Sequence, residues 1–96
     1  MPLYFIEHQH RDETCPTQNA EMMIGLGQHV TQATADTYGV KIHADVVHPG
    51  EHRLNLVLEA DSPDKIASYM LPFMQVGSVM IKPVTTCEEV VRASQD

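Results

Sequence analysis

The 96-residue chain has 43% hydrophobic and 20% charged side chains, which is the composition of one folded globular domain rather than of a disordered segment. Its 13 acidic residues outnumber its six lysines and arginines, and the resulting net charge of −7 disfavours binding to nucleic acid or to an anionic membrane. The N-terminal residues lack the features of a signal peptide, so we expect a cytoplasmic single domain over residues 1–96.

The first part of the chain predicts a strand, a loop and a helix. Residues 2–10 have the length and residue types of one strand. Residues 11–18, rich in charge, threonine and proline, are typical of a loop. From about Asn19 apolar side chains recur at helical spacing, and Gly39 is suited to end that helix.

Two alternating segments then predict a β-hairpin. Apolar and polar side chains alternate in residues 40–47 and again in residues 53–60, where leucines occupy every second position. Pro49 and Gly50 supply the turn between the two segments.

The last part of the chain predicts a second helix and a fourth strand. Asp61 or Ser62 is a suitable N-cap, Pro63 fits the first helical position, and Pro72 should kink or stop the helix. Residues 78–86 form the last strand, and residues 87–94 a terminal turn or short helix. The order β-α-β-β-α-β predicts an α+β ferredoxin-like fold with a four-stranded antiparallel sheet, two helices on one face and an open face that dimerises.

Alternation along the strands predicts which side chains lie on the open face. The leucines of the third strand should meet the helices, and we place Leu3, Phe5, Ile42, Ala44 and Val46 on the same side. The open face then receives Tyr4, Ile6, His8, His10, His43, Asp45, Asn55, Val57 and Glu59. With the first and third strands as parallel neighbours about 4.8 Å apart, Glu59 would lie beside His8 or His10.

The His-x-His pair predicts a metal site. On a strand, His8 and His10 point to one side about 6.5 to 7 Å apart, a spacing that suits chelation of one ion. Glu59, with His43 or Cys15 as further candidates, would complete a ligand set for zinc, nickel or copper. In the structural alternative these histidines form hydrogen bonds across the dimer interface or lie at its wet rim.

A ligand site on the same face is a second interpretation. Tyr4, His8, His43 and Asn55 are its candidate residues, in a small binding or regulatory module. In the enzyme alternative His8, His10 or His43 acts as a general base, and Tyr4 or Asn55 donates hydrogen bonds to a substrate in the cavity. Cys15 precedes a helix and is a weaker candidate for a reactive thiolate.

Two segments carry a resemblance to a known group. "LEADSPDKI", between the third strand and the second helix, and "YMLPFMQVGSVMIKPVTTCEEV", near the end, resemble small ferredoxin-like domains of unknown function in the dimeric α/β-barrel group. That group includes antibiotic-type monooxygenases, haem-degrading enzymes, muconolactone-isomerase-like proteins and small nickel-binding proteins. The resemblance implies a homodimer built from two open sheet faces, and either a ligand- or metal-binding module or a cofactor-free monooxygenase- or isomerase-like enzyme.

Overall fold

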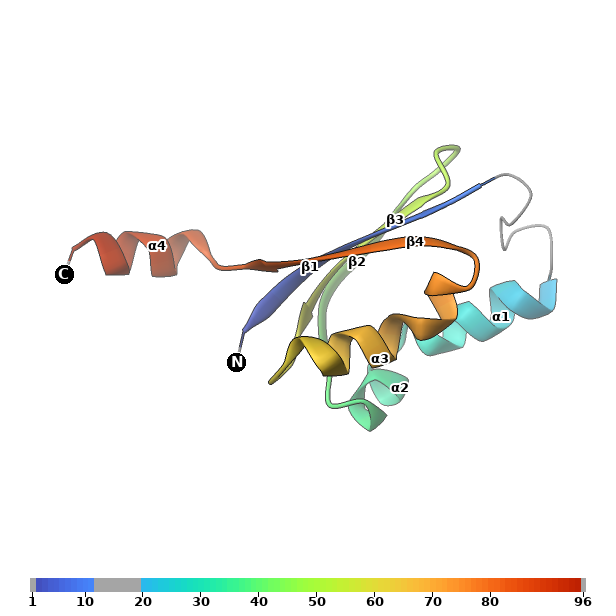
Figure 1. Cartoon of the computed structure of the whole chain (residues 1–96), viewed down its shortest axis with the longest axis horizontal. Helices are drawn as coiled ribbons and strands as arrows, with labels where there is room; N and C mark the ends of the chain where they lie inside the picture. Colours follow the sequence, from blue (N-terminus) through green and yellow to red (C-terminus); the bar gives the residue numbers. More distant parts are fainter. Residues whose placement is uncertain (1, 12–19, 96) are drawn as a thin grey trace.

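The computed structural model describes residues 2–11 and 20–95, which form an α+β fold around a four-stranded sheet (Figure 1). The strands are β1 (Leu3–His10), β2 (Lys41–His48), β3 (Arg53–Glu59) and β4 (Gly77–Val84). The helices are α1 (Ala20–His29), α2 (Gln32–Thr37), α3 (Pro63–Met74) and α4 (Cys87–Ser94). Apart from Arg11, the predicted loop over residues 11–18 falls outside the described residues, as does Cys15.

The predicted first helix is two shorter helices. Thr31 interrupts it, since its hydroxyl donates to the Gln28 carbonyl oxygen at 2.8 Å and accepts from the Thr34 backbone N–H at 3.3 Å. Threonine competes for backbone groups in this way at helix ends, so α1 ends and α2 begins around it. Gly39, with φ of +73°, follows α2 as predicted.

The strand order is β2-β3-β1-β4, and all neighbouring strands are antiparallel. The prediction that β1 and β3 are neighbours is confirmed, but the prediction that these two strands run parallel is wrong. Leu3 lies opposite Glu59, and His8 lies opposite Leu54. The helical crossover makes β1 parallel to β2, and the hairpin reverses the chain, so β3 runs against both. Glu59 therefore lies at the far end of β1 from His10.

The predicted orientation of β1 is also wrong. Tyr4, Ile6 and His8 are buried under the helices, at 7%, 0% and 2% exposure, whereas Leu3 and Phe5 lie on the open face. Directly opposite residues of an antiparallel pair share a face, and Ile6 lies opposite the buried Leu56. Both sets of β1 side chains contain large apolar residues, so alternation alone did not distinguish the buried set.

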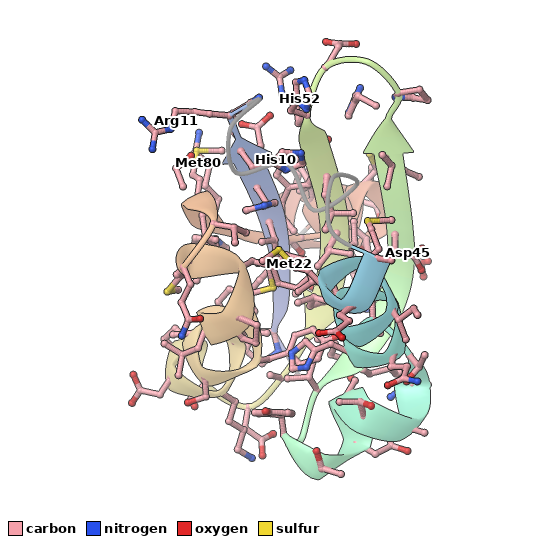
Figure 2. The ribbon with its side chains drawn as sticks, turned by 90° about the vertical axis from the view of Figure 1, so that its right-hand side faces the viewer. His10, Arg11, Met22, Asp45, His52 and Met80 are labelled. Atoms are coloured by element: carbon pink, nitrogen blue, oxygen red, sulfur yellow. The ribbon has the colours of Figure 1, made fainter. Side chains whose placement is uncertain are left out.

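A register shift in β2 changes which of its side chains face the helices. The pairing of β2 with β3 shifts between Ile42 and Ala44. After the shift, Asp45 and Val47 lie opposite the helix-facing leucines of β3, and Ala44 and Val46 turn to the open face. Only Ile42 of the three predicted β2 residues faces the helices. Asp45 is consequently not on the open face, and Figure 2 shows it beside α1.

The core lies between the sheet and α2 and α3, with partly buried residues of α1 packed against it. Ser62 is the N-cap of α3 and Pro63 its first residue, as predicted, while Pro72 lies inside the helix, which ends two residues later. No helix in the described residues is long and apolar enough to cross a membrane. The cytoplasmic location stays a prediction.

The C-terminal helix α4 stands apart from this core. Figure 1 shows it extending from the end of β4, away from α1, α2 and α3. None of its residues is buried, and Val90 and Val91 are 57% and 54% exposed. Thr86 caps it by accepting a hydrogen bond from the Glu89 backbone N–H at 3.1 Å. Local capping rather than packing therefore accounts for this helix.

Candidate functional site

A pocket of about 240 Å³ lies between α1 and the end of the sheet where β1 ends and β3 begins. Its walls are mostly apolar, and the imidazole rings of two β1 histidines also line it. The lining residues are His8, His10, Met23, Leu26, Gly27, Val30, Val47, Arg53, Leu54 and Phe73. Because β1 alternates, the two histidines share the helix-covered face and reach the pocket together.

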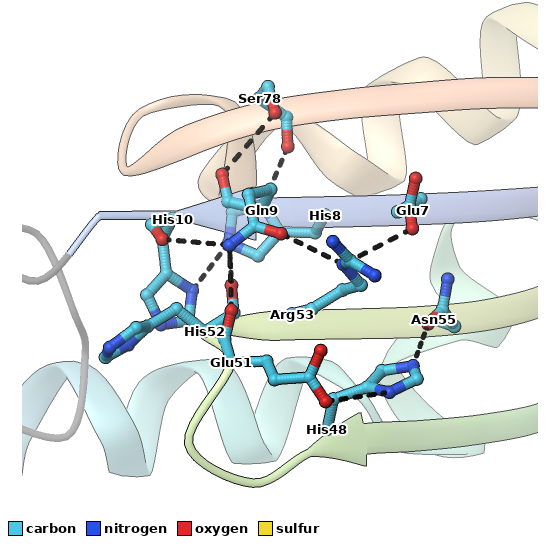
Figure 3. A network of polar contacts seen from close by, with 10 residues as sticks. All are labelled: Glu7, His8, Gln9, His10, His48, Glu51, His52, Arg53, Asn55 and Ser78. Carbon is cyan, nitrogen blue, oxygen red and sulfur yellow. Dashed lines mark hydrogen bonds and ion pairs between the residues drawn. The ribbon is translucent and has the colours of Figure 1, made fainter.

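His8 is held by contacts from three sides. Its Nδ1 lies 3.1 Å from the backbone carbonyl oxygen of Ser78 on β4. The Phe73 ring of α3 meets it edge-on, with ring centroids 5.2 Å apart. The third contact is with His10, whose Nδ1 lies 3.4 Å from Nε2 of His8 (Figure 3). A buried side chain with this many fixed neighbours has one orientation.

These contacts determine the tautomers of both rings. A carbonyl oxygen only accepts, so Nδ1 of His8 carries the hydrogen that it donates to Ser78. In a neutral ring Nε2 of His8 is then an acceptor, and Nδ1 of His10 must be the donor to it. The remaining lone pair of the neutral His10 ring lies on its Nε2.

Burial favours the neutral form of both rings. It lowers the pKa of His8 below the usual 6.5, and although the Ser78 carbonyl opposes this, the neighbouring His10 adds to the lowering. Burial also lowers the pKa of His10, helped by repulsion from His52, whose ring centroid is 5.1 Å away. Figure 2 shows His10 and His52 together at this end of the sheet.

A network of hydrogen bonds holds the rim of the pocket. Gln9 donates from Nε2 to the carbonyl oxygens of Glu51 at 2.8 Å and His52 at 3.1 Å, and accepts from Nε of Arg53 at 3.0 Å (Figure 3). The same Arg53 nitrogen lies 3.4 Å from Oε1 of Glu7. These contacts fasten the β2–β3 turn to β1, and the Glu7 carboxylate pairs with Arg53, the one cation among the described lining residues.

The predicted ligand-binding residues do not gather at one place. Tyr4 is part of the buried core, and His8 lies in the pocket. On the opposite face, His43 Nε2 lies 2.8 Å from Oε1 of Glu59, and Asn55 Oδ1 lies 2.6 Å from Nε2 of His48. The hydrogen bond from His43 lowers the pKa of Glu59. Of the predicted set of four, only His8 lines the pocket.

The predicted metal set is divided in the same way. His8 and His10 are neighbours, with ring centroids 5.3 Å apart, but Glu59 lies near the other end of β1 and on the other face. Both nitrogens of His8 already have hydrogen-bond partners. Within residues 2–11 and 20–95 no group of three or more His, Cys, Asp or Glu side chains is placed to hold a metal ion. Cys15, a further predicted ligand, falls outside these ranges.

Sequence reasoning missed the two residues of α3 and β4 that contact His8, which are Phe73 and Ser78. Ser78 acts through its backbone carbonyl, which no side-chain pattern reveals. The close approach of β4 to β1 at Gly77 is a second omission: a Cβ placed there would lie 2.2 Å from the carbonyl oxygen of Gln9. Only glycine therefore lets β4 start this close to β1, and this single glycine before a β-rich segment was the one available signal.

The fold and site together define a small α+β protein with a histidine-bearing apolar pocket between its sheet and first helix. The chain belongs to the family described as a domain of unknown function (DUF3303), whose model matches residues 2–96. No curated protein matches the chain. The match supports the predicted membership in a family of unknown function.

Proposed function

We propose that this chain is a ligand-binding module of ferredoxin-like type, and that the pocket beside α1 binds its small-molecule ligand. The observation that carries the proposal is the pair of hydrogen-bonded imidazoles within otherwise apolar walls. Small-molecule sites typically combine apolar walls with a few convergent polar groups. The pair His8 and His10 provides those groups, and Met23, Leu26 and Leu54 provide part of the wall.

The size of the pocket favours a small ligand. Its volume of about 240 Å³ is below that of most drug-sized sites, which span about 300 to 1,000 Å³. An engineered apolar cavity of about 150 Å³ binds benzene in another protein. A molecule built on one six-membered ring therefore fits the space beside α1.

A blocking variant tests this proposal. Leu26 lines the pocket, and tryptophan at this position would fill it. Ile24 lies on the same helix, is 61% exposed and does not line the pocket, so Ile24→Trp is the matched control. We expect single-ring compounds to shift the NMR signals of Val47 and Leu54 in the wild type and in the control, but not in Leu26→Trp. Binding that survives in Leu26→Trp would contradict the proposal.

We further propose that two copies pair through their open sheet faces. Seven apolar residues lie on that face: Leu3, Phe5, Ala44, Val46, Val57, Met80 and Val84. Three cations, Lys41, Arg53 and Lys82, and two carboxylates, Glu7 and Glu59, lie among them on the same face. Although each chain carries a net charge of −7, this face is close to neutral, so charge repulsion between two such faces is small.

Light scattering of a charge-insertion variant tests the pairing. Phe5 lies near the centre of the open face, opposite Val57 and Lys82. We expect the wild type to have twice the mass of the 10.7 kDa chain, Phe5→Glu to have the mass of one chain, and the outward-facing Ile24→Glu to behave as the wild type. A wild type of 10.7 kDa at micromolar concentration would refute the dimer.

The enzyme alternative also has a specific observation in its favour. The lone pair on Nε2 of His10 lies on a ring that lines an apolar pocket, and such a nitrogen suits a general base in an isomerase- or monooxygenase-like reaction. Both reactions begin by removing a proton from the substrate. We expect the wild type, and not His10→Ala, to accelerate deuterium exchange next to the carbonyl of a single-ring ketone. Equal rates would remove this alternative.

A further inference from the structure

The hydrogen-bond direction in the histidine pair specifies the chemistry of a ligand. Hydrogen is donated from Nδ1 of His8 to Ser78 and from Nδ1 of His10 to His8, as the carbonyl acceptor requires. Each neutral imidazole has one donor and one acceptor, so the pair ends in an acceptor at Nε2 of His10. A ligand that reaches this nitrogen must therefore supply the hydrogen.

Among the described residues, the walls provide no strong site for an anion. The only cation among the described lining residues is Arg53, whose side chain belongs to the open sheet face, where its Nε lies 3.0 Å from Oε1 of Gln9 and 3.4 Å from Oε1 of Glu7. The chain also carries a net charge of −7, which repels anions at long range. A carboxylate or phosphate entering the pocket would lose hydration without gaining an unpaired positive charge.

The burial of His8 maintains the direction of these two hydrogen bonds. Reversing both hydrogen bonds would place a lone pair on Nδ1 of His8 against the carbonyl oxygen of Ser78. His8 is 2% exposed, so no bulk water could compensate for that repulsion. The contact between His8 and Ser78 thus determines the direction of both hydrogen bonds. As a result, the ring of His10, which lines the pocket, has its acceptor at Nε2.

We infer that the pocket selects a neutral, single-ring apolar molecule bearing a hydroxyl group, and that this hydroxyl donates a hydrogen bond to Nε2 of His10. The inference rests on the proposed function of the pocket and names the class of its ligand. The ring occupies the apolar space between Leu26 and Leu54, and the hydroxyl satisfies the acceptor at which the histidine pair ends.

Phenol, toluene and benzoate test this class. Phenol and toluene have nearly the same shape, but only phenol donates a hydrogen bond. The quantity to measure is the ratio of the toluene Kd to the phenol Kd, obtained from NMR titrations of the wild type, His10→Leu and His43→Leu. His43 lies on the open face and contacts Glu59, so it is the matched control.

We expect the ratio of the toluene Kd to the phenol Kd to fall about 3- to 10-fold in His10→Leu, because that change corresponds to the loss of one neutral hydrogen bond. In His43→Leu the ratio should stay unchanged. Benzoate should bind at least about tenfold more weakly than phenol to the wild type. Long-range ¹H–¹⁵N spectra should show hydrogen on Nδ1 of both His8 and His10.

Failure of the inference is distinguishable from failure of the proposed function. An unchanged ratio in His10→Leu, tighter binding of benzoate than of phenol, or hydrogen on Nε2 of His10 would overturn the hydroxyl class while ligands still bind in the pocket. If none of the three compounds shifts the signals of Leu26, Val47 or Leu54, both the inference and the proposed function are refuted.

Discussion

The buried ring of His8 donates a hydrogen bond to the backbone carbonyl of Ser78, joining the first strand to the last across 3.1 Å. Replacing His8 by alanine would leave that carbonyl and Nδ1 of His10 without their partner, and would open a cavity beside Phe73. We expect the free energy of unfolding of His8→Ala to fall by about 2 to 4 kcal/mol in urea titrations.

His43→Ala is the control for this substitution. It removes a histidine from the open face, where its contact with Glu59 is exposed to water, so little change in the unfolding midpoint is expected. Equal effects of the two substitutions would show that the His8–Ser78 bond contributes little to the fold.

The lowered pKa of His8 predicts a loss of stability below neutral pH. Burial favours the neutral ring, so the folded chain binds fewer protons than the unfolded chain between the folded pKa and 6.5. Stability should therefore decrease as the pH falls through 6.5 and level off below the folded pKa. Urea midpoints measured across this range should show a smaller slope for His8→Asn, which cannot titrate.

Glu59 acts in a separate, more acidic range. Its pKa is lowered below the usual 4.5, first by the hydrogen bond from His43, so its contribution is present above 4.5 and is lost only as the pH falls through its folded pKa. A pH dependence near neutrality that persists in His8→Asn and vanishes in Glu59→Gln would contradict the assignment to His8.

Two glycines should respond oppositely to alanine. At Gly77 a Cβ would lie 2.2 Å from the Gln9 carbonyl oxygen, and β4 would have to move away from β1. We expect Gly77→Ala to lose about 1 to 3 kcal/mol of stability and to disturb the His8 signals in NMR spectra. At Gly25, inside α1, a Cβ meets nothing within 4 Å, so Gly25→Ala should gain about 0.5 to 1 kcal/mol. Thermal unfolding of the pair checks both signs.

Amide hydrogen exchange should separate α4 from α3. Four residues of α3, including Tyr69 and Phe73, are buried, whereas α4 buries none. An isolated helix of this length is marginal in water, so its amides should exchange much faster than those of α3. Slow exchange in α4 would show that its exposed valines are covered in solution, and dilution of the sample would then reveal whether a second chain covers them.

The sequence predicted the strands and helices well because each has local signals. Ser62 and Pro63 mark the start of α3, and the alternating leucines mark β3. The strand neighbours also followed from the order of elements. The division of the first helix depended on Thr31, whose hydroxyl forms hydrogen bonds with backbone groups of Gln28 and Thr34. The spacing of apolar residues, from which the helix was predicted, does not reveal such hydrogen bonds.

The site was predicted less well because it depends on orientation and on backbone atoms. Alternation groups Tyr4, His8 and His10 correctly, but it does not say which of two apolar faces is buried. An incorrect strand direction then placed Glu59 beside the histidines, while in the structure it pairs with His43. The true partner of His8 is the carbonyl of Ser78, and carbonyls are common to every residue.

His8 and Ser78 lie 70 positions apart in the chain, and this separation has a consequence for the order of folding. Strand β1 is made first by the ribosome, yet its neighbours β3 and β4 begin only at residues 53 and 77. A nascent chain that ends before Gly77 leaves one edge of β1 unpaired and the His8 ring without its carbonyl acceptor. The direction of the hydrogen bonds from His10 to His8 and from His8 to Ser78 is thus fixed late, when the last strand pairs with β1. Such long-range pairing is slow in the folding of sheets.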